Sequence, residues 1–123
     1  MNPDRKQITR RYKETARPAG LFAVRNTVEG MMLVGASVDL PAMLNRQRFQ
    51  LQMKCHPDKA LQADYDRLGP GAFNFEVLDR LESSEISEAD LRRDLVTLLD
   101  MWVARLESQG QELYALRLAP PRR

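Results

Sequence analysis

Two apolar, strand-like runs joined by a short polar turn stand near the start of the sequence, and no other stretch combines these features. The runs cover residues 21–24 and 31–34. Residues 26–30 between them include turn formers, and Gly30 is free to adopt the positive φ angle that such a turn often needs. This pattern predicts a β-hairpin at the centre of a small sheet, with both arms buried on at least one face.

Length and composition restrict the class of protein. A chain of 123 residues with 43% apolar residues is sufficient for one domain with a modest core. The single cysteine, Cys55, cannot form an internal disulfide, and no apolar run approaches the roughly 18 residues of a membrane span. The charged start lacks the apolar core of a secretory signal. We therefore expect a reduced, cytoplasmic protein with no membrane contact.

Charge is distributed unevenly along the chain. Residues 1–60 hold eleven basic and five acidic side chains, whereas residues 61–123 hold eight and twelve. Residues 1–15 are expected to form a basic helix that includes Arg10, Arg11 and Lys13. This helix would lie along a phosphate backbone, or it would be a solvated arm that only keeps the chain soluble. Charge alone does not decide between these two interpretations.

Local signals divide the middle of the chain into three elements. Asp39 is expected to cap a helix that ends near residue 54, and Asp58 a shorter helix that ends before Gly69. Alternation of apolar residues then predicts a half-buried strand at residues 73–78.

The last third of the chain is expected to be mainly one helix. Ser87 resembles the first residue of a capping box, and Gly110 is placed to end the helix that follows. Residues 113–118 form a possible short edge strand, and residues 119–123 are expected to be a loose tail. An apolar stripe over about five turns comprises Leu91, Leu95, Leu98, Trp102 and Leu106.

The spacing of the hairpin resembles that of the GIY-YIG nuclease family. Gly20-Leu21-Phe22 stands where the first triplet is expected, and Leu33-Val34-Gly35 follows after ten residues. The resemblance covers about residues 14–115. It implies an α/β fold with a small, mainly antiparallel three-stranded sheet flanked by helices, here as one domain over residues 1–123 with an extra N-terminal helix. Further resembling positions are Ala36, Ser37, Asn45, Arg46, Arg48, Phe49, His56, Leu61, Gln62, Gly69, Phe73, Phe75, Leu78 and Trp102.

The family also implies a metal-dependent hydrolase of phosphodiesters. Its members use a tyrosine in each triplet, an arginine on the first helix, a metal-binding glutamate on the long helix and often a late asparagine. Such groups activate water, stabilise the charged phosphate and hold a divalent ion. By the family's spacing, the corresponding residues here are Phe22, Leu33, Met43, Leu99 and Ala115. None of them has the required side chain, so the site is interpreted as degenerate.

Two neighbouring side chains are candidate substitutes. Arg46 lies one helical turn beyond Met43, within reach of a similar phosphate. Asp100 is adjacent to Leu99, but about 100° around the helix, so it would point away from a cleft in this register. The alternative is that the apolar residues at the family's positions simply fill the core. Cys55 and His56 are too few ligands for a structural zinc, so no metal site is predicted.

Three hypotheses for function remain open. The first is a degenerate nuclease domain without cleavage activity that binds DNA or RNA through Arg46, Arg48 and the basic start of the chain. The second is a divergent, active endonuclease that requires Mg²⁺ and uses Arg46 and Asp100; no cofactor is predicted otherwise. The third is an interaction or assembly module that binds a protein partner or forms a homodimer.

Overall fold

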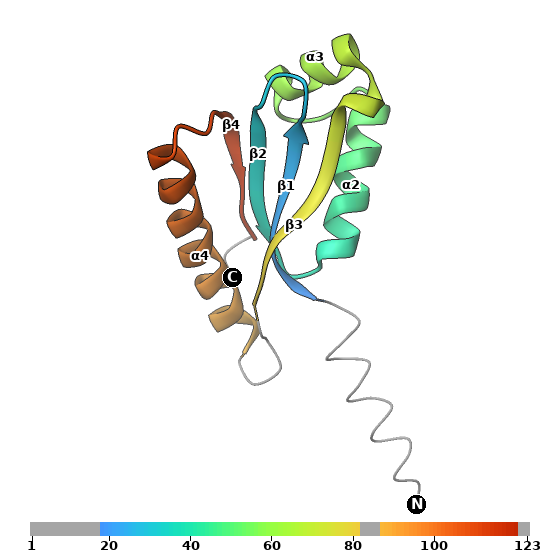
Figure 1. The fold of residues 1–123 in the computed structure, drawn as a ribbon. Helices are drawn as coiled ribbons and strands as arrows, with labels where there is room; N and C mark the ends of the chain where they lie inside the picture. The colour runs from blue at the N-terminus through green and yellow to red at the C-terminus, as the bar shows by residue number, and fades with distance from the viewer. Residues whose placement is uncertain (1–17, 82–86, 121–123) are drawn as a thin grey trace, which may run out of the picture.

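The computed structural model describes residues 18–81 and 87–120 (Figure 1). Three helices and a four-stranded sheet make up most of this part of the chain. The expected helix at residues 1–15, with Arg10, Arg11 and Lys13, lies outside the described residues. The elements are β1 (Ala19–Asn26), β2 (Met32–Ser37), α2 (Leu40–Gln52), α3 (Lys59–Leu68), the short 3₁₀ helix η1 (Pro70–Ala72), β3 (Phe73–Leu81), α4 (Glu88–Ser108) and β4 (Leu113–Leu118).

The predicted hairpin is present and forms the middle of the sheet. The strand order is β3-β1-β2-β4, with β1 antiparallel to both β2 and β3. The side-chain oxygen Oδ1 of Asn26 accepts hydrogen bonds from the backbone N–H groups of Val28 and Glu29, at 3.1 and 2.9 Å. Gly30 then completes the turn with φ = 80°. The polar turn residues therefore act as the sequence predicts.

The sheet has four strands, where three and a possible edge strand were expected. The segment at residues 113–118 is the fourth strand, and it runs parallel to β2 at the edge of the sheet. Long helix α4 separates β3 from β4 along the chain, which provides the crossover that such an arrangement needs. The expected tail begins at Ala119; Pro120 is buried, and residues 121–123 are outside the described part.

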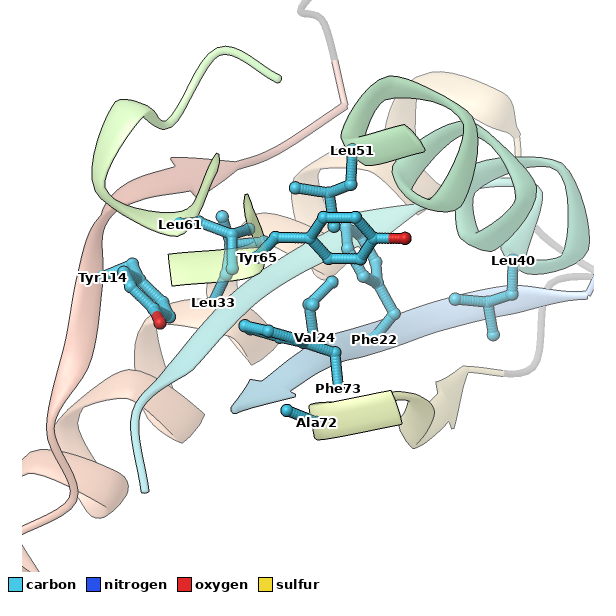
Figure 2. Packing of buried hydrophobic residues seen from close by; sticks show 10 residues of the cluster. All are labelled: Phe22, Val24, Leu33, Leu40, Leu51, Leu61, Tyr65, Ala72, Phe73 and Tyr114. Carbon is cyan, nitrogen blue, oxygen red and sulfur yellow. The ribbon is translucent and has the colours of Figure 1, made fainter. Parts of the chain in front are cut away.

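Helices cover both faces of the sheet, and the hairpin contributes alternate side chains to each (Figure 1). On the first face, Phe22, Val24 and Leu33 pack against residues of α2 and α3. Figure 2 shows this cluster, with Leu51 and Tyr65 on the helix side. On the second face, Leu21 and Val34 belong to a cluster completed by α4. We call these the α2/α3 face and the α4 face.

The helix starts follow the predicted caps. The carboxylates of Asp39 and Asp58 accept hydrogen bonds from Ala42 N and Leu61 N, and Ser87 accepts one from Asp90 N. Among the described residues, no helix is both long and apolar enough to span a membrane.

Candidate nucleic-acid interface

Helix α2 carries the two described arginines that sequence analysis proposed as phosphate ligands. It follows β2 directly, and Leu40, Gln47 and Leu51 form its buried side. Asp39 fixes the first turn, and its own N–H donates to Ser37 Oγ at 2.9 Å. The start of the helix is thus anchored to the end of a central strand. This anchoring sets which side chains of α2 face outward.

Arg46 and Arg48 are both exposed, but they lie on different flanks of α2. At 3.6 residues per turn, two positions correspond to about 160° around the axis. Arg46 lies on the flank of Met43, whereas the Arg48 guanidinium lies over the ring of Phe75 in β3, 4.8 Å from its centroid. Phe49 lies between them and is 59% exposed. The outward face of α2 is therefore an exposed aromatic ring with a cation on each side.

The two triplet positions lie inside the protein. Phe22 and Leu33 are completely buried on the α2/α3 face (Figure 2). The ring of Phe22 lies against Gly35, where an added Cβ atom would come within 2.7 Å of Phe22 Cζ and of the Leu118 carbonyl oxygen. The space beyond the end of this ring is thus filled by neighbouring chain. Neither residue can contact a phosphate in this arrangement.

Of the other family positions, Met43 lies on the same side of the sheet as these two, and Leu99 does not. Met43 is half-buried against the α2/α3 cluster, and Ala115 is exposed on β4. Leu99 is 3% exposed and packs on the α4 face, on the opposite side of the sheet from Phe22. The substitute Asp100 is exposed on α4, so the structure does not bring it beside Arg46. The sheet separates the positions that a single hydrolytic centre would combine.

The residues at these positions do not fit a divalent metal. Mg²⁺ takes oxygen ligands, and the side chains of Leu99, Phe22 and Leu33 offer none. Across the described residues, no group of three or more His, Cys, Asp or Glu side chains is arranged to hold an ion. Phe22, Leu33 and Leu99 therefore cannot serve as ligands of a metal ion.

A buried polar cluster that the sequence did not indicate lies at the junction of α2 and α3. His56 is fully buried; its Nδ1 accepts a hydrogen bond from Asp58 N at 3.0 Å, and its Nε2 lies 2.6 Å from Gln47 Oε1. Acceptance at Nδ1 places the proton on Nε2, which donates to Gln47. Burial lowers the pKa of His56, and the nearby Asp58 carboxylate opposes this change. His56 is thus a neutral histidine with a structural role.

Gln62 and Asp58 extend this cluster to the backbone. Gln62 Oε1 accepts from His56 N at 3.0 Å, and Gln62 Nε2 donates to the Leu51 carbonyl at 3.0 Å. Asp58 Oδ2 accepts from Leu116 N in β4 at 3.1 Å. The loop after α2 is thus attached to α3 and to β4. The sequence had marked His56 and Gln62 only as positions of the family resemblance, and Gln47 only by its helical spacing from Leu40 and Leu51.

A second polar group lies beside the hairpin turn. The hydroxyl of buried Tyr114 donates to Asp64 Oδ2 at 2.7 Å and accepts from Asn26 Nδ2 at 3.1 Å. Burial and the adjacent carboxylate raise the pKa of Tyr114. Burial also raises the pKa of Asp64, but hydrogen bonds from Tyr114 and Arg67 outweigh it, so the net shift is downward. This tyrosine therefore keeps its proton and acts as a hydrogen-bond donor within the fold.

Comparison with known proteins identifies structures of similar fold. No family model and no curated protein matches the sequence. Two solved structures of the catalytic domain of I-TevI do match the fold, each at 22% sequence identity. One, of the homing endonuclease's catalytic domain, has a TM-score of 0.62 and covers 83% of this chain and 99% of that chain. The other, a mutant of this intron endonuclease domain, has a TM-score of 0.61 and covers 77% and 90%.

These similarities extend over almost the whole of the neighbouring domain. They agree with the order of elements that the triplet spacing predicted. At this level of identity the likeness concerns the fold and leaves the chemistry of the site to its own residues. The chain therefore has the GIY-YIG-like fold of the I-TevI catalytic domain.

Proposed function

We propose that this chain is a nuclease-fold protein that binds nucleic acid through the outward face of α2 and does not cleave it. The observation that carries the proposal is the burial of Phe22, Leu33 and Leu99 at the positions that the family resemblance assigns to hydrolysis. Side chains without oxygen or nitrogen neither activate water nor hold a metal ion. A protein that descends from a nuclease but no longer cleaves would keep the fold and lose these groups.

Support for nucleic-acid binding comes from α2. Arg46 and Arg48 are exposed, and within the described residues neither forms an ion pair. Arginine is well suited to phosphate oxygens because its guanidinium presents several donors in a plane. The structurally similar I-TevI domains belong to endonucleases, which act on nucleic-acid chains. Arg10, Arg11 and Lys13 are proposed to add further phosphate contacts within the single domain.

The salt dependence of binding tests this proposal. Labelled single- and double-stranded DNA and RNA are titrated with the protein at several salt concentrations, and fluorescence anisotropy gives the affinity. We expect log affinity to fall linearly with log salt, because phosphate contacts release counterions. Arg46→Ala and Arg48→Ala should each reduce the slope by about one. Arg93→Ala on α4, which removes the partner of Asp90, is the control and should leave the slope unchanged. Affinity that is equal at low and high salt would contradict the proposal.

A specific observation also favours an interaction module as the second candidate function. Phe49 of α2 and Met53, the capping residue directly after the helix, lie four residues apart, and each is 59% exposed. Two large apolar side chains one turn apart are a common form of contact with a partner helix or a second copy of a chain. Light scattering over a wide concentration range measures self-association. A dimer that Phe49→Asp abolishes would favour this function, and a strict monomer would argue against the homodimer.

A further inference from the structure

A hollow lies beside α2, next to the proposed phosphate ligand Arg48. It lies between α2, α3 and β3, is open to solvent and has a volume of about 520 Å³. This volume falls within the range of small-molecule sites. Its lining includes Arg48, Gln52, Tyr65, Phe73, Asn74 and Phe75. The floor is aromatic and rigid, because Tyr65 and Phe73 are buried and their ring centroids are 5.4 Å apart.

Arg48 forms one wall of the hollow and is held from two sides. Its guanidinium carbon lies 4.8 Å from the centroid of the Phe75 ring, and its Nη1 donates to Asn45 Oδ1 at 3.3 Å. When one face of the planar guanidinium packs on an aromatic ring, the opposite face of the plane stays free. Arg48 is exposed, so this opposite face is open to solvent. That second face is available for a flat ligand.

The polar groups of the hollow suit the edge of such a ligand. The Gln52 and Asn74 side chains are exposed amides, and each offers both donors and an acceptor. Glu76, the only acidic side chain of the lining, is paired with Arg25 through contacts of 3.0 and 3.3 Å. The hollow thus combines a stacking surface and two amides. Its one carboxylate is neutralised by Arg25, so the charge of Arg48 gives the lining a net positive charge.

We propose that this hollow receives an unpaired nucleobase of a single-stranded nucleic acid, stacked on the outer face of Arg48. The inference rests on the proposed function and specifies the form of nucleic acid that the protein prefers. Bases within a duplex are already stacked, whereas an unpaired base is free to stack on an aromatic ring or on an arginine plane. The charged chain that carries the base then passes over the exposed face of α2.

The test separates stacking from charge. Affinities are measured by anisotropy for a 12-nucleotide single strand, as DNA and as RNA, and for an abasic strand and a duplex of the same length. Arg48→Lys keeps the charge but removes the planar group. Arg105→Lys on α4 is the matched control, because the Arg105 guanidinium also lies over an aromatic ring, 5.4 Å from the Trp102 centroid, but outside the hollow. Thermal melting confirms that both variants are folded. We expect Arg48→Lys to weaken binding to the single strand about tenfold with an unchanged salt slope. Arg48→Lys should bind the abasic strand as tightly as the wild type does, and Arg105→Lys should bind every strand as tightly as the wild type does.

Two kinds of result would overturn the inference, and they differ in what they mean for the proposed function. If Arg48→Lys binds the single strand as tightly as the wild type, or if the abasic strand binds as tightly as the strand with bases, the inference is overturned while the proposed function stands. If the wild type binds none of the strands at any salt concentration, the proposed function fails and this inference fails with it.

Discussion

The two faces of the sheet are built from the same strands but are packed in different ways. On the α4 face, residues such as Leu21, Leu95 and Leu99 form a cluster of apolar side chains under one long helix. On the α2/α3 face, the apolar cluster is flanked by buried polar groups, among them His56 and Asp58. These groups attach a loop and a strand edge to the helices next to the hollow.

The difference separates two structural roles. The hydrophobic effect is non-directional, so apolar packing provides stability and tolerates repacking by side chains of similar volume. Hydrogen bonds fix geometry, and they fix it around α2, where the proposed interface lies. We therefore expect changes on the α4 face to act on the whole fold and changes in the polar cluster to act locally.

The largest effect is expected from a truncation on the α4 face. Leu95 is completely buried between α4 and the sheet, so Leu95→Ala removes buried methyl groups and leaves a cavity. We expect the free energy of unfolding to fall by about 3 kcal/mol. Urea denaturation monitored by circular dichroism measures this loss. A change below about 1 kcal/mol would show that this face does not hold the fold together.

A smaller and more local effect is expected from Asp58. Its carboxylate accepts from Leu61 N at 3.0 Å and from Leu116 N at 3.1 Å, so Asp58→Ala leaves two backbone donors without partners. We expect a loss of about 2 kcal/mol. Hydrogen exchange should speed up at these two amides far more than in α4. Equal acceleration throughout the chain would remove the distinction between the two faces.

The pH dependence of stability reports on the same cluster through His56. Because its pKa is lowered in the folded protein, the unfolded chain binds the proton more readily. Stability is then complete above the unfolded pKa near 6.5 and falls as the pH drops below that value toward the folded pKa. The loss is at most about 1.4 kcal/mol per pH unit for one proton.

Urea midpoints between pH 7.5 and pH 5 measure this dependence. His56 is the only histidine of the chain, so a His56→Gln variant should have a flatter profile in this window. Asp64, whose pKa is lowered, contributes only at more acidic pH, as the pH falls below about 4. A wild-type profile that stays flat down to pH 5 would show that His56 is not buried in its neutral form.

Elements with local signals were predictable from the sequence. The hairpin, α2, α3 and α4 appear where expected because capping residues such as Asp58 and Ser87 act within one turn of the chain. Strand lengths were underestimated, because β1 begins at Ala19 and β3 ends at Leu81. The small or charged residues at these strand ends give no apolar alternation. The triplet spacing predicted the correct fold.

Long-range pairing was not predictable. The parallel contact of β4 with β2 depends on the crossover through α4, and no residue in β4 encodes its partner. Likewise, Tyr114 contacts Asp64, which lies fifty positions earlier in the sequence. Sequence patterns specify faces of single elements, whereas a site depends on how those faces meet.

Cleavage is the most direct test of the central claim, that the protein binds nucleic acid without hydrolysing it. End-labelled single- and double-stranded DNA and RNA are incubated with excess protein in Mg²⁺, in Mn²⁺ and in chelator, and the products are separated on a denaturing gel. We expect binding in a parallel gel-shift assay and no products in any lane. Metal-dependent products that Asp100→Ala or Arg46→Ala removes would contradict it, because a hydrolytic centre would then exist despite the burial of Phe22, Leu33 and Leu99.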